Sequence, residues 1–146
     1  MDWTVGRIWK ITKFERGWSL NRERTWSHFS IRAKEVKKWK DFFKEEAELL
    51  EIPKLDKMGI DVYSTFATRS LQDPGNNMPA VKAAVDGLVA AGIVEDDIPE
   101  HVGYITFHSP IYEKGVDSVC LLISELLSGV PSVTEVGYLT SGSKLF

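Results

Sequence analysis

Apolar residues recur at helical spacing in two stretches of this chain. In the first, residues 31–50, the apolar positions lie three or four apart: Val36, Trp39, Phe43, Ala47 and Leu50. Lysines fill much of the remaining surface of that stretch, so it predicts a long helix with an apolar stripe in the core and a basic outer face. The second stretch, residues 80–91, shows the same spacing: Val81, Ala84, Val85 and Leu88. Pro79 suits its first turn and Gly92 suits its end, so a shorter central helix is expected there.

Strands are predicted on both sides of the central helix. Residues 60–67 alternate apolar and polar side chains, which is typical of a strand with one buried face. Residues 1–14 indicate a strand or two, and residues 101–108 indicate another strand. Residues 116–127 are apolar enough for a fully buried strand that becomes helical at its end. These elements predict an α/β (α+β) domain in which a mixed sheet of about four strands packs against the long basic helix and the central one.

The length of 146 residues predicts one domain with enough apolar content for a core. We assign residues 1–127 to that domain. Residues 128–146 are rich in Ser and Gly, and we expect a C-terminal tail that adds an edge strand or contacts a partner subunit. Cys120, in an apolar run, predicts a buried thiol in a reducing compartment. No apolar run approaches 18 residues and the N-terminus has no signal-like segment, so a cytoplasmic protein without membrane association is expected.

Carboxylates stand at both ends of the central helix. Asp73 lies in a turn sequence before it, and Asp96 and Asp97 follow it. If the chain folds back so that these acids meet, they raise one another's pKa unless a cation compensates them. Oxygen ligands favour Mg²⁺ or Mn²⁺, which activates water for attack on phosphorus, and Lys82 adds a positive charge near the same end. The alternative is a solvated acidic turn and an ion pair between Lys82 and Asp86, one helical turn apart.

Basic residues are concentrated in the N-terminal part of the chain. Residues 1–44 contain twelve Lys and Arg against five Asp and Glu, whereas residues 45–146 contain six against sixteen. This division suits a protein that holds the phosphates of a polyanion in one region and a cation in another. The expected DNA contacts are Arg22, Arg24, Lys34, Lys37, Lys38 and Arg69. The alternatives are a basic helix that only maintains solubility, and aromatic side chains that anchor a loop to the core instead of stacking on bases: Trp18, Trp26 and Phe29.

The stretch from Asp73 to Asp97 resembles the core of the RusA family of Holliday-junction resolvases, particularly its phage-encoded members. The family pattern runs D-x-D-N, then K-x-x-x-D-x-L-x-x-A-G, then a hydrophobic pair before Asp-Asp. This chain reads D-P-G-N, K-A-A-V-D-G-L-V-A-A-G and I-V-E-D-D at those places. The resemblance implies a Mg²⁺-dependent endonuclease of DNA recombination and repair, in a bacterial or phage-infected cell. It also implies a homodimer that presents one site to each of two symmetric strands of a four-way or branched DNA junction.

Carried over residue by residue, the resemblance implies that Asp73 and Asp97 bind the metal and that Lys82 assists catalysis. Asp96 supports the metal site, and Asn76 matches the family's Asn. Gly75 stands where the family has its second loop carboxylate, so Asn76, Asn77 or Asp96 would have to supply an oxygen in its place.

A second departure precedes the first acid. Residues 68–72 contain one arginine, Arg69, where the family usually has a run of them. This second departure predicts weaker binding of DNA close to the metal. The alternative function, which Gly75 suggests, is a RusA-like protein that binds DNA junctions without cutting them.

Overall fold

A five-stranded sheet forms one layer of the computed structural model, which describes residues 3–68 and 76–128. Its strands are β1 (Trp3–Lys13), β2 (Met58–Phe66), β3 (Val102–Phe107), β4 (Ile111–Tyr112) and β5 (Ser118–Ser128). The strand order is β1-β5-β2-β3, and β4 also pairs with β2. β2 runs parallel to β3 and β4 and antiparallel to β5, which is antiparallel to β1. The predicted mixed α/β architecture is therefore confirmed, with the two-residue β4 as a strand beyond the four expected.

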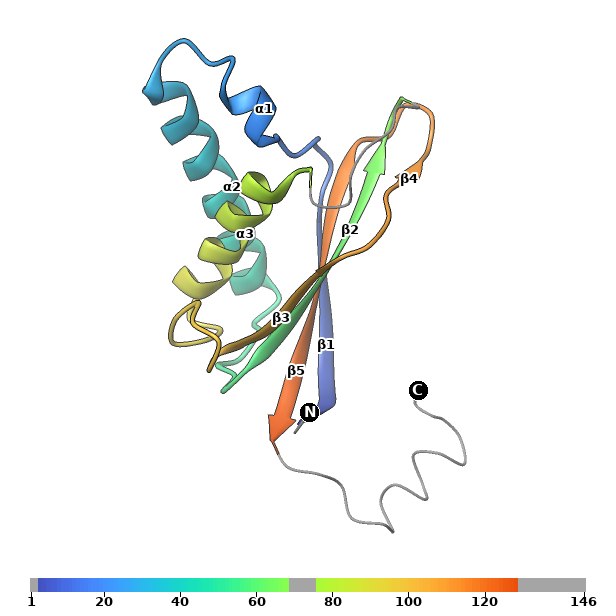
Figure 1. The fold of residues 1–146 in the computed structure, drawn as a ribbon. Helices are drawn as coiled ribbons and strands as arrows, with labels where there is room; N and C mark the ends of the chain where they lie inside the picture. Colours follow the sequence, from blue (N-terminus) through green and yellow to red (C-terminus); the bar gives the residue numbers. More distant parts are fainter. Residues whose placement is uncertain (1–2, 69–75, 129–146) are drawn as a thin grey trace.

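The helices all lie on one face of the sheet (Figure 1). They are α1 (Leu20–Glu23), α2 (Phe29–Leu49) and α3 (Met78–Ala90). α2 begins after His28, whose ring accepts a hydrogen bond from the Ser30 backbone N–H. α3 has Pro79 in its first turn, and Gly92 follows it with a φ of 87°. The two predicted helices are thus confirmed to within two residues at each end. Within the described ranges, no helix is long and apolar enough to cross a membrane.

The core lies between the helices and the sheet. Its buried side chains from the sheet include Ile11, Ile60, Val62, Leu121 and Ile123. Those from the helices include Trp39, Phe43, Ala47, Val81, Ala84, Val85 and Leu88. At the crossing of α2 and α3, a Cβ on Gly87 would lie 2.3 Å from the backbone oxygen of Lys40. Much of the K-A-A-V-D-G-L pattern is therefore explained by helix packing, because only small side chains allow the two backbones to approach so closely.

The N-terminal stretch forms a single strand, which agrees with the predicted strand or two, and it has a bulge between Val5 and Ile8. Several finer predictions are wrong. β5 stays extended to Ser128 instead of becoming helical. Leu50 follows the last turn of α2 and is 45% exposed. Cys120 is only half-buried, because its position faces the side of the sheet that no helix covers. The predicted tail lies outside the described residues, apart from Ser128.

Candidate functional site

Lys82 joins two carboxylates on the exposed side of α3. Its Nζ donates to Asp97 Oδ2 at 2.9 Å and to Asp86 Oδ1 at 3.0 Å. The hydrogen bond from Lys82 is the main cause that lowers the pKa of Asp97 below its usual value. Conversely, the hydrogen bonds to Asp97 and Asp86 raise the pKa of Lys82. The expected pair of Lys82 with Asp86 does form, and the acidic turn also folds back onto the helix.

A buried hydrophobic pair anchors the acidic turn. Ile93 and Val94 are 0% and 2% exposed, and the Leu55 backbone N–H donates to the Ile93 carbonyl at 2.6 Å. Glu95, next in the chain, pairs with Lys54 instead of pointing to α3. The turn therefore separates its acids, and Asp97 is the one that reaches Lys82.

Asp96 has a local role in this geometry. Its Oδ1 accepts a hydrogen bond of 2.8 Å from the backbone N–H of Asp97, which stabilises the turn. Both residues are exposed, so their remaining oxygens face solvent. A metal-binding role for Asp96 stays a prediction.

The N-terminus of α3 is tied to β2 by a buried amide. Asn77 occupies the N-cap position, is 2% exposed, and donates from Nδ2 to Ser64 Oγ at 3.0 Å. Its Oδ1 has no hydrogen-bond partner among the described residues. The signal for this contact in the sequence is Ser64, a polar residue at a core-facing position of an alternating strand, and it was not among the predicted site residues.

Oxygen donors of the kind that Mg²⁺ prefers stand around Lys82, but the described part of the chain contains no group of three or more His, Cys, Asp or Glu that could hold an ion. Asp73, Gly75 and Arg69 lie outside the described residues, and Asn76 lies directly after that gap. The carboxylate oxygens of this site therefore fit a hard divalent ion such as Mg²⁺. The acids within the described residues are too few to hold the ion by themselves.

The basic face of α2 is largely paired. Lys38 lies 2.7 Å from Glu15 and 3.2 Å from Glu35, and Lys37 pairs with Asp41. These carboxylates raise the pKa of both lysines. The other predicted DNA contacts in the N-terminal part are exposed: Arg22, Arg24 and Lys34.

The aromatic residues near this basic region have different roles. Trp18 is buried at 3% exposure and donates from Nε1 to Glu23 Oε2 at 2.8 Å. Trp26 packs against the core and contacts the Trp18 ring, with 5.9 Å between the ring centroids. The core-anchor alternative is thus correct for these two tryptophans. Phe29 is 81% exposed and stacks on His28, so it is not a core anchor.

No family model matches the chain, and no curated protein matches it. The resemblance to RusA resolvases therefore remains a prediction from the residues quoted above.

Proposed function

We propose that this protein is a structure-selective endonuclease that resolves four-way or branched DNA junctions by Mg²⁺-dependent hydrolysis of a phosphodiester. The observation that carries the proposal is the contact between Lys82 and Asp97. These two residues match the resolvase pattern, are 15 positions apart in sequence, and form a direct charged contact on an exposed surface.

In this proposal Asp97 acts together with Asp73, and Asp96 and Asn76 supply further oxygens. A bound Mg²⁺ would neutralise charge on the phosphate and favour deprotonation of the attacking water. Lys82 has two roles of its own. It holds the Asp97 carboxylate against α3, and its ammonium stabilises the negative charge that develops on the phosphate oxygens.

The basic residues in the N-terminal half of α2, in α1 and directly after α1 would hold the DNA. Arg22, Arg24 and Lys34 are exposed and suited to phosphate contacts, which position a duplex without reading its sequence. Lys37 and Lys38 would first have to leave their carboxylate partners. A homodimer would present two such surfaces to the two symmetric strands of a junction.

The test is cleavage of a synthetic four-way junction in Mg²⁺ and in Mn²⁺. Asp97→Asn should reduce the rate by at least about a hundredfold, because it removes a charged ligand. Glu95→Gln is the matched control, since Glu95 lies in the same turn but pairs with Lys54 on another side. Absence of metal-dependent cleavage by the natural protein, or equal rates for Asp97→Asn and Glu95→Gln, would refute the proposal.

A second candidate is a protein that binds branched DNA and does not cut it. It is favoured by Gly75, which replaces a carboxylate, and by the lack of a three-acid group within the described residues. Gel shifts in EDTA should then show tighter binding to a junction than to linear duplex, without cleavage when metal is added. Gly75→Asp separates the two candidates, because gain of cleavage in that variant alone identifies a binder that lost a ligand.

A further inference from the structure

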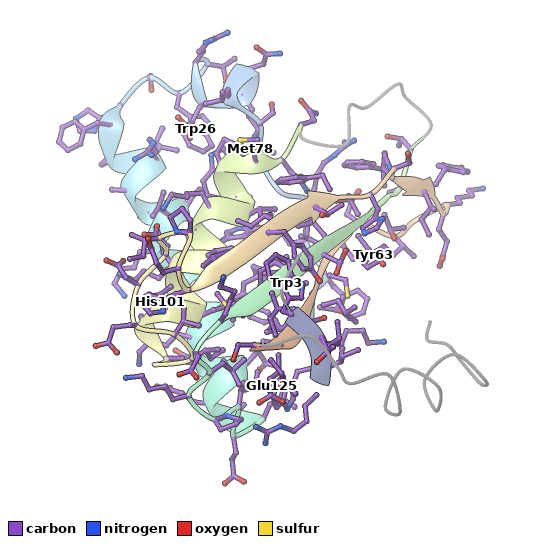
Figure 2. The ribbon with its side chains drawn as sticks, turned by 60° about the horizontal axis from the view of Figure 1, so that its bottom comes forward. Trp3, Trp26, Tyr63, Met78, His101 and Glu125 are labelled. Atoms are coloured by element: carbon purple, nitrogen blue, oxygen red, sulfur yellow. The ribbon has the colours of Figure 1, made fainter. Side chains whose placement is uncertain are left out.

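The face of the sheet opposite the helices carries a connected row of aromatic rings. No described helix covers this face (Figure 1), and strand register gives its side chains. The row contains Trp3, Tyr104, His108 and Tyr63. Figure 2 shows Trp3 and Tyr63 along the strands, away from the end of the molecule where Trp26 and Met78 lie.

Two of these rings, Trp3 and Tyr104, stack across the two strands that separate β1 from β3. Trp3 comes from β1 and Tyr104 from β3, yet their ring centroids are 6.4 Å apart, with 26° between the planes. Tyr104 lies so close to Gly59 that a Cβ there would be 2.3 Å from the ring. Ser124, on this same face of β5, is only 3% exposed. Trp3 and Tyr104 are themselves half-buried, so the rings cover the backbone with one side and leave surface exposed on the other.

The other two rings form a stacked pair beside them. His108 and Tyr63 have centroids 4.3 Å apart and planes 4° from parallel, and Tyr63 is 44% exposed. Asp61 connects the two halves of the row, since its carboxylate accepts from His108 Nε2 at 2.7 Å and from the Tyr104 hydroxyl at 3.3 Å.

The charge of this face suits an anion. Lys57 lies 5.1 Å from the centre of the Trp3 ring, and Lys10 is exposed on β1 with its side chain on the same face. Among the strand positions described on this face, Asp61 is the one carboxylate, and its two oxygens are already hydrogen-bonded.

We propose that this face binds single-stranded nucleic acid, with unpaired bases stacked on the row of rings and phosphates near Lys57 and Lys10. The extended segment from residue 57 to residue 63, which runs into β2, spans about 20 Å and suits two or three stacked bases. Thr12, Thr65 and Thr106 flank the rings, and the exposed aliphatic side chains of Val5, Ile8 and Ile111 lie on the same face. The rings together with the two lysines, and not the composition of the whole face, carry the proposal. The proposal goes beyond junction cleavage, because the rings lie on the side of the sheet opposite α3.

The test measures fluorescence anisotropy of labelled oligothymidine and oligouridine of about 12 nucleotides in EDTA. Tyr63→Ala should weaken binding about tenfold, whereas Tyr63→Phe, which keeps the ring, should stay within about twofold. The same comparison is made at Tyr104, where Tyr104→Leu should weaken binding and Tyr104→Phe, which keeps the ring, should not. Leu49→Ala is the control, since Leu49 is 76% exposed at the end of α2 and should leave binding unchanged.

Photocrosslinking locates the contact independently of stability. An oligonucleotide that carries 5-iodouracil should crosslink to peptides containing Tyr63, Tyr104 or Trp3. Crosslinks confined to α1 and α2, or equal affinity of Tyr63→Ala and Tyr63→Phe, would overturn the proposal. It would also be overturned if Tyr63→Ala dissociated a dimer without changing affinity for either oligonucleotide, because the face would then belong to a second copy. This binding test is made in EDTA, whereas junction cleavage requires a metal ion. Failure of oligonucleotide binding and failure of junction cleavage can therefore be told apart.

Discussion

The two faces of the sheet are built differently. The face under the helices carries aliphatic side chains such as Ile60, Val62 and Leu121, all of which are at most 1% exposed. The opposite face carries half-exposed rings that reach across strands and polar groups that bond to one another. Close packing of aliphatic side chains stabilises the covered face. The open face is stabilised by a few ring contacts and hydrogen bonds between strands that are far apart in sequence. Substitutions on the two faces should therefore lower the free energy of unfolding by different amounts, even where the distance to the nearest neighbour is the same.

Two glycines offer the most direct test of this contrast, beginning with Gly87. A Cβ here would lie 2.3 Å from the Lys40 carbonyl oxygen, and this neighbour is helix backbone that cannot move alone. Gly87→Ala should therefore separate α2 from α3 and lower the free energy of unfolding by about 3 kcal/mol, or the Tm by roughly 10 °C. Thermal unfolding followed by circular dichroism measures the effect. A loss of less than about 1 kcal/mol would contradict the close crossing.

The ion pair beside the β1 bulge should make stability depend on pH. Glu125 accepts hydrogen bonds from the side chain and backbone of Arg7, which lower its pKa to about 2. Its stabilising effect should be complete above about pH 4.5, the ordinary pKa, and should disappear as pH falls towards 2. Because the Arg7 side chain is 61% exposed, solvent screening reduces the expected loss in Glu125→Gln to on the order of 1 kcal/mol at pH 7.

Urea unfolding of both forms between pH 7 and pH 2 checks this prediction. The difference between the natural protein and Glu125→Gln should shrink across the acidic range. A difference that stays constant would mean that the carboxylate charge contributes nothing.

Gly59 is the counterpart of Gly87 on the open face. The hypothetical Cβ distance is again 2.3 Å, but the neighbour is the Tyr104 ring, which can swing into solvent. Gly59→Ala should cost only about 1 kcal/mol, and much of that cost should vanish in the background of Tyr104→Leu. A double-mutant cycle on the Tm measures this coupling. If the two substitutions were simply additive, the ring would not lie over Gly59.

The smallest expected effect concerns backbone geometry at the end of α2. Glu51 has a φ of 54°, and the Ile52 N–H after it donates to the Ala47 carbonyl as the helix ends. Glycine adopts this conformation without strain, so Glu51→Gly should raise the free energy of unfolding by about 0.5 to 1 kcal/mol. A lower Tm in this variant would contradict the left-handed conformation.

The parts that the sequence predicted depend on contacts between near neighbours. Spacing of apolar residues located α2 and α3, and Gly92 marked the end of the shorter helix. The turn with Asp97 could be expected to return to Lys82, because only the rest of α3 and a short loop separate them. The position of Asp73, another predicted metal ligand, lies outside the described residues.

The parts that were missed depend on residues distant in sequence. The pairing of Lys38 with Glu15 neutralises one lysine of the basic face, and the helix alone could not predict it because Glu15 comes from another segment. The stacking of Trp3 on Tyr104 requires the register of four strands, which alternation within each strand does not specify. His108 could not be paired with Asp61 for the same reason, because 47 positions separate them.

The pairing of β1 with β5 also has a consequence for how the chain folds during synthesis. Trp3 lies opposite Ser128 and Lys13 opposite Val119, so this ladder joins residues more than a hundred positions apart. The helices and β2 can form local structure as they leave the ribosome, but β5 is the sole partner of β1 among the described strands, so β1 stays unpaired until β5 has emerged. A nascent chain stopped before residue 118 should therefore remain sensitive to protease at its N-terminus, and one extended well beyond residue 128 should become resistant in a single step.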